Sequence, residues 1–392
     1  MREALYHSAR ALEDAASLPG VRPVRLHRIG VPLFAVEIGA LVEDRQPYDL
    51  LDRFVGRAIA EAGLRTVPDI AGFLGLDEAM VDRVLRFLGG VGHVVVQPDG
   101  TLALTRLGLR SVHDDTRYVP KRDRQRLYFD GIVGEPLPAA YYERKVVVWD
   151  AAEAREQKWH RLMEHACAFR HDSLQRLAAR PDRRDFNLPD ELSEVTFESL
   201  SNAYLPCYVI RTVTPAGPSL LMYSAVPETR DEHLAALSRA WPALTGTLDA
   251  GDSGDVRAEF GGWLADRDID PSHLQWTDSG TLRLTLPPAR FADARADNGR
   301  RANGKGAFTL TQLGSYTAAR SHVLQLWCDD PRLRREAVLE RATNRVIASR
   351  KLSAAEAEAF LTRLCAQLET SPLTLDDLRR YAHRTGQSPL PL

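Results

Sequence analysis

The sequence predicts an α+β protein, in which a small unit of three helices and a hairpin near the N-terminus precedes one or two mixed α/β domains with mainly antiparallel strands. Three observations support this fold class. The chain has 392 residues, which is too long for one small domain. Hydrophobic residues make up 44% and charged residues 27% of it, as in ordinary globular proteins. Segments with a helical period of apolar residues alternate with segments rich in Val, Ile and Leu that are bounded by turn residues.

These patterns predict four regions. They are residues 1–45 with a helix and a strand pair, 46–112 with the three helices and hairpin, 113–148 with a basic linker and a hairpin, and 149–392 as a mixed α+β region with a sub-boundary near 250. In the first region, residues 2–17 have helical periodicity and end at Pro19-Gly20. Residues 21–42, punctuated by Gly30 and Pro32, predict two strands.

The second region has the clearest local signals. Residues 48–63 predict an amphipathic helix that ends at Gly63, and Thr66 caps the next helix with Asp69 as its partner. A third helix is predicted over 78–88, with an inward face made by the apolar residues Met80, Val81, Val84, Leu85 and Leu88. Two strands, 93–97 and 101–105, follow around the turn Pro98-Asp99-Gly100.

This order of helix, helix, helix and hairpin resembles the winged helix-turn-helix superfamily of bacterial transcription regulators. The resemblance covers residues 47–112 only, and it depends on the Asp69-Ile70-Ala71…Leu74-Gly75-Leu76-Asp77…Val81…Leu85 pattern, the hairpin at 93–105 and the Leu-Thr-x-x-Gly ending at 104–108. It implies that the third helix enters the major groove of DNA while the hairpin touches the backbone.

The chemistry of the third helix leaves two alternatives open. Arg83 and Arg86 on its outward face could meet phosphates or guanine edges. Asp82 lies on the same face and would be repelled by phosphate. The region is therefore predicted to bind DNA or to dock a partner protein through these three residues.

Two basic segments are further candidates. Residues 116–126 carry five basic side chains against Asp123, and could track a phosphate backbone or form a solvated linker; they are Arg117, Lys121, Arg122, Arg124 and Arg126. The loop 299–306 nearly spells a phosphate-binding P-loop, but Gly306 stands where a Ser or Thr must follow the Lys. We expect it to be a basic loop that touches a phosphate-bearing ligand through Arg300, Arg301 and Lys305, or a plain surface loop.

No metal or cofactor is expected. A long helix is predicted over 151–179, and it would place His160, Glu164, Cys167 and His171 on one stripe. Because a helix rises roughly 16 Å over that span, one ion could not reach both ends of the stripe. No nucleophile, zinc or dinucleotide motif of a known enzyme class occurs, so no catalytic residue is assigned.

Charge and cysteine usage limit the function classes. Lys and Arg total 51 against 53 Asp and Glu, which argues against a wholly basic nucleic-acid coat protein. The start has no signal-peptide pattern, no stretch is suited to span a membrane, and the four cysteines are isolated, which indicates reduced cytoplasmic thiols. The sequence thus predicts a non-enzymatic cytoplasmic bacterial protein, able to form a homodimer, that binds DNA or a partner protein as a regulator or as an accessory subunit of a DNA-handling or defence system. The alternative is an enzyme of unrecognised family with its site in 146–330.

Overall fold

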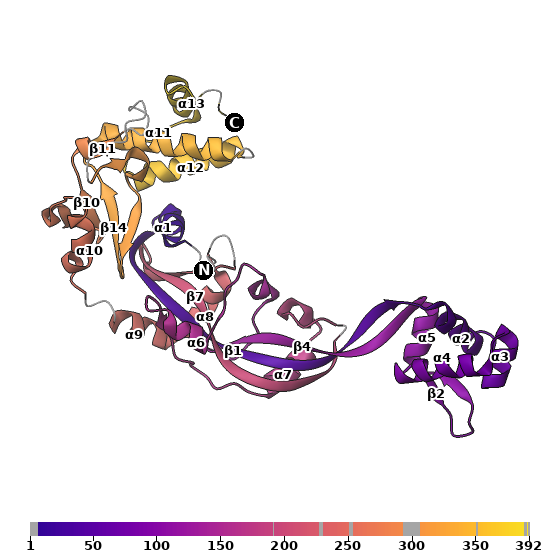
Figure 1. The fold of residues 1–392 in the computed structure, drawn as a ribbon. Coiled ribbons are helices and arrows are strands. Elements are labelled where there is room, and N and C mark those ends of the chain that lie inside the picture. The colour runs from indigo at the N-terminus through magenta and orange to yellow at the C-terminus, as the bar shows by residue number, and fades with distance from the viewer. Residues whose placement is uncertain are drawn as a thin grey trace.

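The protein is an α+β structure organised around one large, mixed and curled sheet (Figure 1). The computed structural model describes residues 7–190, 192–226, 230–250, 254–292, 306–349, 352–387 and 390. The helices are α1 (Ser8–Ser17), α2 (Leu50–Ala60), α3 (Val67–Leu74), α4 (Glu78–Gly90), α5 (Arg106–His113), α6 (Ala151–Glu156), α7 (Asp172–Ala178), α8 (Glu232–Arg239), α9 (Pro242–Ala250), α10 (Val256–Ala265), α11 (Pro331–Ala348), α12 (Ala354–Gln367) and α13 (Leu375–Arg384).

The sheet is built around one long strand, β1 (Arg22–Pro47), where the sequence predicted two strands. Its first part pairs antiparallel with β7 (Ser193–Thr214), and its second part, from Leu33 on, also pairs antiparallel with β4 (Thr116–Asp130) on the other side. Pro32 does not break β1. Its carbonyl points to the side of β1 on which β4 lies, and it accepts from the backbone N–H of Gly131, just past the end of β4. The amide hydrogen that proline lacks would point to that same side, so no ladder bond is lost.

The remaining strands extend the sheet on both flanks. Most pairs are antiparallel, but β6 with β1 and β10 with β14 are parallel. The other strands of the large sheet are β5 (Trp149–Asp150), β6 (Arg161–Leu162), β8 (Gly217–Tyr223), β9 (Leu274–Trp276), β10 (Leu282–Thr285), β13 (Tyr316–Ala319) and β14 (His322–Trp327). Two small separate pairs are β2 (Val94–Val96) with β3 (Leu102–Leu104), and β11 (Phe291–Ala292) with β12 (Phe308–Thr309).

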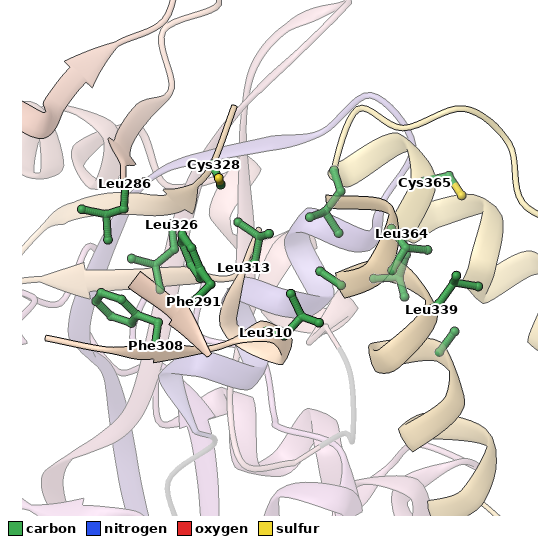
Figure 2. Close-up of a cluster of buried hydrophobic side chains, with 14 of the residues drawn as sticks. Leu286, Phe291, Phe308, Leu310, Leu313, Leu326, Cys328, Leu339, Leu364 and Cys365 are labelled. Atoms are coloured by element: carbon green, nitrogen blue, oxygen red, sulfur yellow. The ribbon is translucent and has the colours of Figure 1, made fainter. Parts of the chain in front are cut away.

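In the C-terminal part, helices α11 and α12 share a buried core with strands β10 and β14, and α13 packs against α11 and α12. Figure 2 shows Leu310 and Leu313 between two groups of this core, with Leu326, Phe291 and Phe308 on the strand side and Leu339 and Leu364 on the helix side. Side chains next to the helix starts cap these helices. Asp330 caps α11, which begins at Pro331, and capping boxes begin α12 at Ser353 and α13 at Thr374.

Two predicted elements differ from the structure. The stretch expected as a basic linker is mostly strand β4, because it pairs residue by residue with β1. The helix predicted over 151–179 is wrong. The chain leaves α6 after Glu156 and forms β6 beside β1, since Met163 is buried in the same core as Val31 and Leu205 of the sheet. Tertiary burial outweighs local helical periodicity here.

Residues 48–115 form a separate unit, which we call the distal unit. It contains α2 to α5 and the β2–β3 hairpin, and it has its own small core that includes Val55, Ile70, Val81 and Leu88. Helices α2, α3 and α4 and the hairpin lie where the sequence predicted them. Helix α5 was not predicted; it begins at Thr105, whose side chain caps it.

Gly108 on α5 tests this packing, because a Cβ there would lie 2.2 Å from the backbone oxygen of His93. Backbone cannot move aside cheaply, so we expect Gly108→Ala to destabilise the distal unit by roughly 1–3 kcal/mol. Gly72 on α3 has nothing within 4 Å, so Gly72→Ala should stabilise by about 0.5–1 kcal/mol. Hydrogen exchange of the distal unit in the full chain measures the change in stability that each variant causes. If both variants changed the stability equally and in the same direction, the close packing of Gly108 on His93 would be contradicted.

Candidate functional site

The distal unit stands at the end of a two-stranded arm. From Leu33 to Leu41, β1 lies between β4 and β7, but from Val42 to Pro47 it pairs within the described residues with β4 alone. Figure 1 shows the arm leaving the sheet and carrying the distal unit away from the rest of the molecule. The chain enters the unit from β1 and leaves it into β4, so both connections run along the arm.

A buried ion pair fixes the unit to the arm. The Arg117 guanidinium donates to the Asp52 carboxylate of α2 at 2.9 Å and to Gln46 Oε1 of β1 at 2.8 Å. The side chains of Arg117 and Asp52 are 18% and 8% exposed. The same guanidinium lies 5.1 Å from the ring centre of Phe87 on α4. Burial is the largest influence on the Asp52 carboxyl and raises its pKa, although the hydrogen bond and the charge of Arg117 lower it.

Tyr118 makes the second attachment. Its backbone oxygen lies 2.7 Å from Nε2 of the fully buried His93, and its backbone N–H donates to Ser111 Oγ at 3.3 Å. Its hydroxyl donates to Asp114 at 2.9 Å, and the Arg110 guanidinium lies 4.1 Å from its ring centre. Arg117 and Tyr118, two consecutive residues of β4, therefore contact the distal unit where it joins the arm. These contacts set the orientation of the unit on the arm.

Helix α4 presents the residues that the sequence singled out. Arg83 is exposed and makes no ion pair within the part of the chain that the structure describes, whereas Arg86 is paired with Asp82 on the same helix. Met80, predicted to face inward, is instead 44% exposed, while Val81 is fully buried. Met80 lies at the border of the buried stripe and in the first turn of the helix, where it remains in contact with solvent.

The solvent face of α4 is thus more apolar than its sequence suggested. Phe87 is also 43% exposed, so Met80, Arg83 and Phe87 follow one another at helical spacings of three and four along one stripe. The distal unit as a whole carries many large apolar side chains in contact with solvent. Those at least 43% exposed are Leu50, Phe54, Phe73, Met80, Phe87, Val95, Val96 and Leu109.

The charge of the distal unit is negative. Residues 48–115 contain seven arginines and no lysine against ten Asp and Glu, a formal charge of −3. Asp77 and Glu78 stand at the start of α4, and the hairpin tip carries Asp99 and no basic residue. A helix that reads DNA would need a positive surface around it.

Most of the basic segment on β4 is paired within the protein. Besides Arg117, Arg124 contacts Glu198 of β7 at 2.8 Å, and Arg126 contacts Glu37 of β1 at 2.7 Å, which lowers the pKa of Glu37. Only Lys121 and Arg122 of the five predicted residues are exposed without an ion pair to any described residue. The segment therefore serves first as a structural strand.

A pocket of about 470 Å³ lies at the root of the arm, where β1, β4 and β7 run side by side. Glu198 reaches Arg124 across Gly39, where a Cβ would stand 2.6 Å from Glu198 Oε1. Because Gly39 of β1 has no side chain, it leaves room for the ion pair between Arg124 of β4 and Glu198 of β7. The lining mixes Arg122 and Arg124 with acidic side chains, so it offers no surface of one charge.

The other candidates lie elsewhere or outside the described residues. His160, Glu164, Cys167 and His171 do not share a helix, because α7 begins only at Asp172. Among the described residues, no group of three His, Cys, Asp or Glu side chains could hold a metal ion, and no helix is both long and apolar enough to cross a bilayer. The basic loop with Arg300, Arg301 and Lys305 lies outside the described residues.

No family model, no curated protein and no solved structure matches this chain.

Proposed function

We propose that the distal unit is a winged helix-turn-helix module that docks a partner protein, and that the chain acts as a non-enzymatic regulator or accessory subunit. The order α2, α3, α4 and hairpin supports the fold assignment. The observation that carries the function is the apolar stripe of Met80 and Phe87 on α4, the helix that would face DNA in such a module. Exposed apolar side chains gathered on one small unit favour a protein interface over a phosphate backbone.

The partner that fits this unit has an apolar surface edged by Lys or Arg. The charge of −3 over residues 48–115 attracts a basic rim, and Asp77 and Glu78 stand beside the stripe at the start of α4. The arm supports this proposal as well, because it holds the unit away from the body and leaves α4 accessible. Arg83, in the middle of the stripe, supplies one cation for a carboxylate of the partner.

The experiment is photo-crosslinking from a photoreactive residue at position 80 in host cells, compared with position 133 on the body. Val133 is 46% exposed, so it is a matched control for exposure. We expect one protein to crosslink at 80 only, before and after nuclease treatment. With that protein purified, Met80→Asp should weaken binding by ten-fold or more, Glu78→Lys should weaken it less, and Val133→Asp should leave it unchanged.

The second candidate function is DNA binding, which the exposed cations Arg83, Lys121 and Arg122 favour, because none of them makes an ion pair with a described residue. It predicts duplex binding tighter than the usual nonspecific range of about 10⁻⁴–10⁻⁶ M at physiological salt, with a salt slope that falls by about one unit for each cation removed. Duplex binding that depends on Arg83 but not on Met80, together with no crosslinked protein, would replace the docking proposal.

A further inference from the structure

A second exposed site lies on the body of the protein, at the turn between α6 and β6. Trp159 projects from this turn with 77% of its surface exposed, the highest value among the exposed large apolar side chains of the described chain. The turn is ordered at both ends. The backbone N–H of Lys158 donates to the backbone oxygen of Glu156 at 3.0 Å, and that of His160 donates to the backbone oxygen of Gln157 at 3.0 Å. Strand β6 then pairs with β1.

His160 anchors the turn from below. Its ring packs edge-on against Trp149, with the ring centres 4.9 Å apart, and lies 6.5 Å from the ring centre of Tyr208 on β7. Burial, together with the nearby charge of Arg28, lowers the pKa of His160 to about 4. The neutral imidazole thus stays packed at physiological pH, and the adjoining Trp159 is held outward.

Cations flank the exposed indole along the chain. Arg155, Lys158 and Arg161 are all exposed within four residues of Trp159, and Arg28 lies half-buried beside His160. None of the four makes an ion pair with a described residue, although Arg161 donates to the backbone oxygen of Thr247 at 2.7 Å. The segment also has exposed carboxylates, at Glu156 and Glu164, so its positive character is local to the indole.

We propose that Trp159 is a stacking platform for a base of single-stranded nucleic acid, and that Arg155, Lys158 and Arg161 contact the flanking phosphates. Single-stranded nucleic acids are bound by exposed aromatic rings interleaved with cations, because every base has a face that can stack. A duplex offers no such face, since its bases already stack on one another.

The surroundings argue against the other occupants of an exposed indole. A protein hot spot is set among apolar neighbours. Along the described chain Trp159 has none nearby, because the next comparably exposed large apolar side chains are Val133 before it and Phe197 after it. An interfacial membrane anchor likewise needs several apolar groups on one face. An isolated indole among cations fits a nucleobase and its phosphates best. This inference is independent of the partner-docking role of the distal unit.

The test is equilibrium binding of a labelled oligothymidylate of about a dozen nucleotides to the full chain, followed by fluorescence anisotropy. We expect Trp159→Ala to weaken binding roughly 5- to 150-fold and Trp159→Phe to retain most of it. Trp276→Ala is the matched control, because Trp276 is 52% exposed on β9, and it should bind as the parent does. Lys158→Ala should lower the salt slope by about 0.7, because it removes the cation that would neutralise one phosphate.

An abasic strand of the same length separates stacking from charge. It keeps the phosphates and lacks the bases, so the parent and Trp159→Ala should bind it equally weakly. The proposal is overturned if the parent does not bind oligothymidylate, if Trp159→Ala binds it as the parent does, or if the duplex of the same length competes as well as the single strand. Binding to vesicles of anionic lipid that depends on Trp159, without binding to the oligonucleotide, would instead assign the indole to a membrane surface.

Discussion

Leu85→Asp is expected to unfold the distal unit while leaving the body folded. Leu85 is 7% exposed in the small core of the unit, so the change removes leucine packing, which costs about 2–5 kcal/mol, and buries an unpaired carboxylate in addition. A unit of this size has little stability to spare. Hydrogen exchange of the full chain should lose protection over residues 50–112 and keep it in the C-terminal core around Leu326.

Met80→Asp is the matched control for this experiment. It introduces the same charge on the same helix, five residues away, but at a side chain that is 44% exposed. We expect protection of the unit to remain close to that of the parent. If Met80→Asp unfolds the unit as Leu85→Asp does, the orientation of α4 described above is wrong, and with it the stripe proposed for docking.

The parts that the sequence predicted well are those specified by neighbours in the chain. The Thr66 cap involves residues only three positions apart, and the helix that it begins lies where expected. The buried stripe of Val81, Leu85 and their neighbours follows from helical period alone, and only its border residue was misplaced.

The parts that it missed depend on contacts between distant residues. The run from Arg117 to Arg126 has the composition of a solvated linker, but its partners Asp52, Glu37 and Glu198 lie roughly 65 to 90 positions away in the chain. No local pattern indicates that these charges will meet. The same reason explains the arm, since the 26-residue strand β1 is stabilised by neighbours from two distant segments. It also means that residues 45–112 alone would lack the Arg117 and Tyr118 contacts that complete the unit.

The buried pair of Arg117 and Asp52 should therefore be worth far more than its exposed counterparts. Asp52→Ala leaves the guanidinium of Arg117 with Gln46 alone in a largely buried place, and removing one partner of such a pair costs about 3–5 kcal/mol. We expect the lower end of that range, because Arg117 is still 18% exposed. Protection from hydrogen exchange should fall in α2 and at the arm end, residues 42–47 and 116–121.

Three further variants separate the net contribution of this ion pair to stability from the cost of leaving Arg117 buried without its partner. Arg57→Ala removes an exposed pair with Glu61 on the same helix, so it should change protection little. Asp52→Leu combined with Arg117→Met should recover most of the loss, since two apolar groups leave no charge unpaired. Asp52→Asn should cost less than Asp52→Ala, because it keeps an acceptor for Arg117. It should also abolish the contribution that Asp52 itself makes to stability at low pH. Burial raises the pKa of Asp52, so the folded unit binds this proton more tightly, and that contribution is lost as pH rises through the raised value. If Asp52→Ala costs no more than Arg57→Ala, the arm and the unit are held together by something other than this pair.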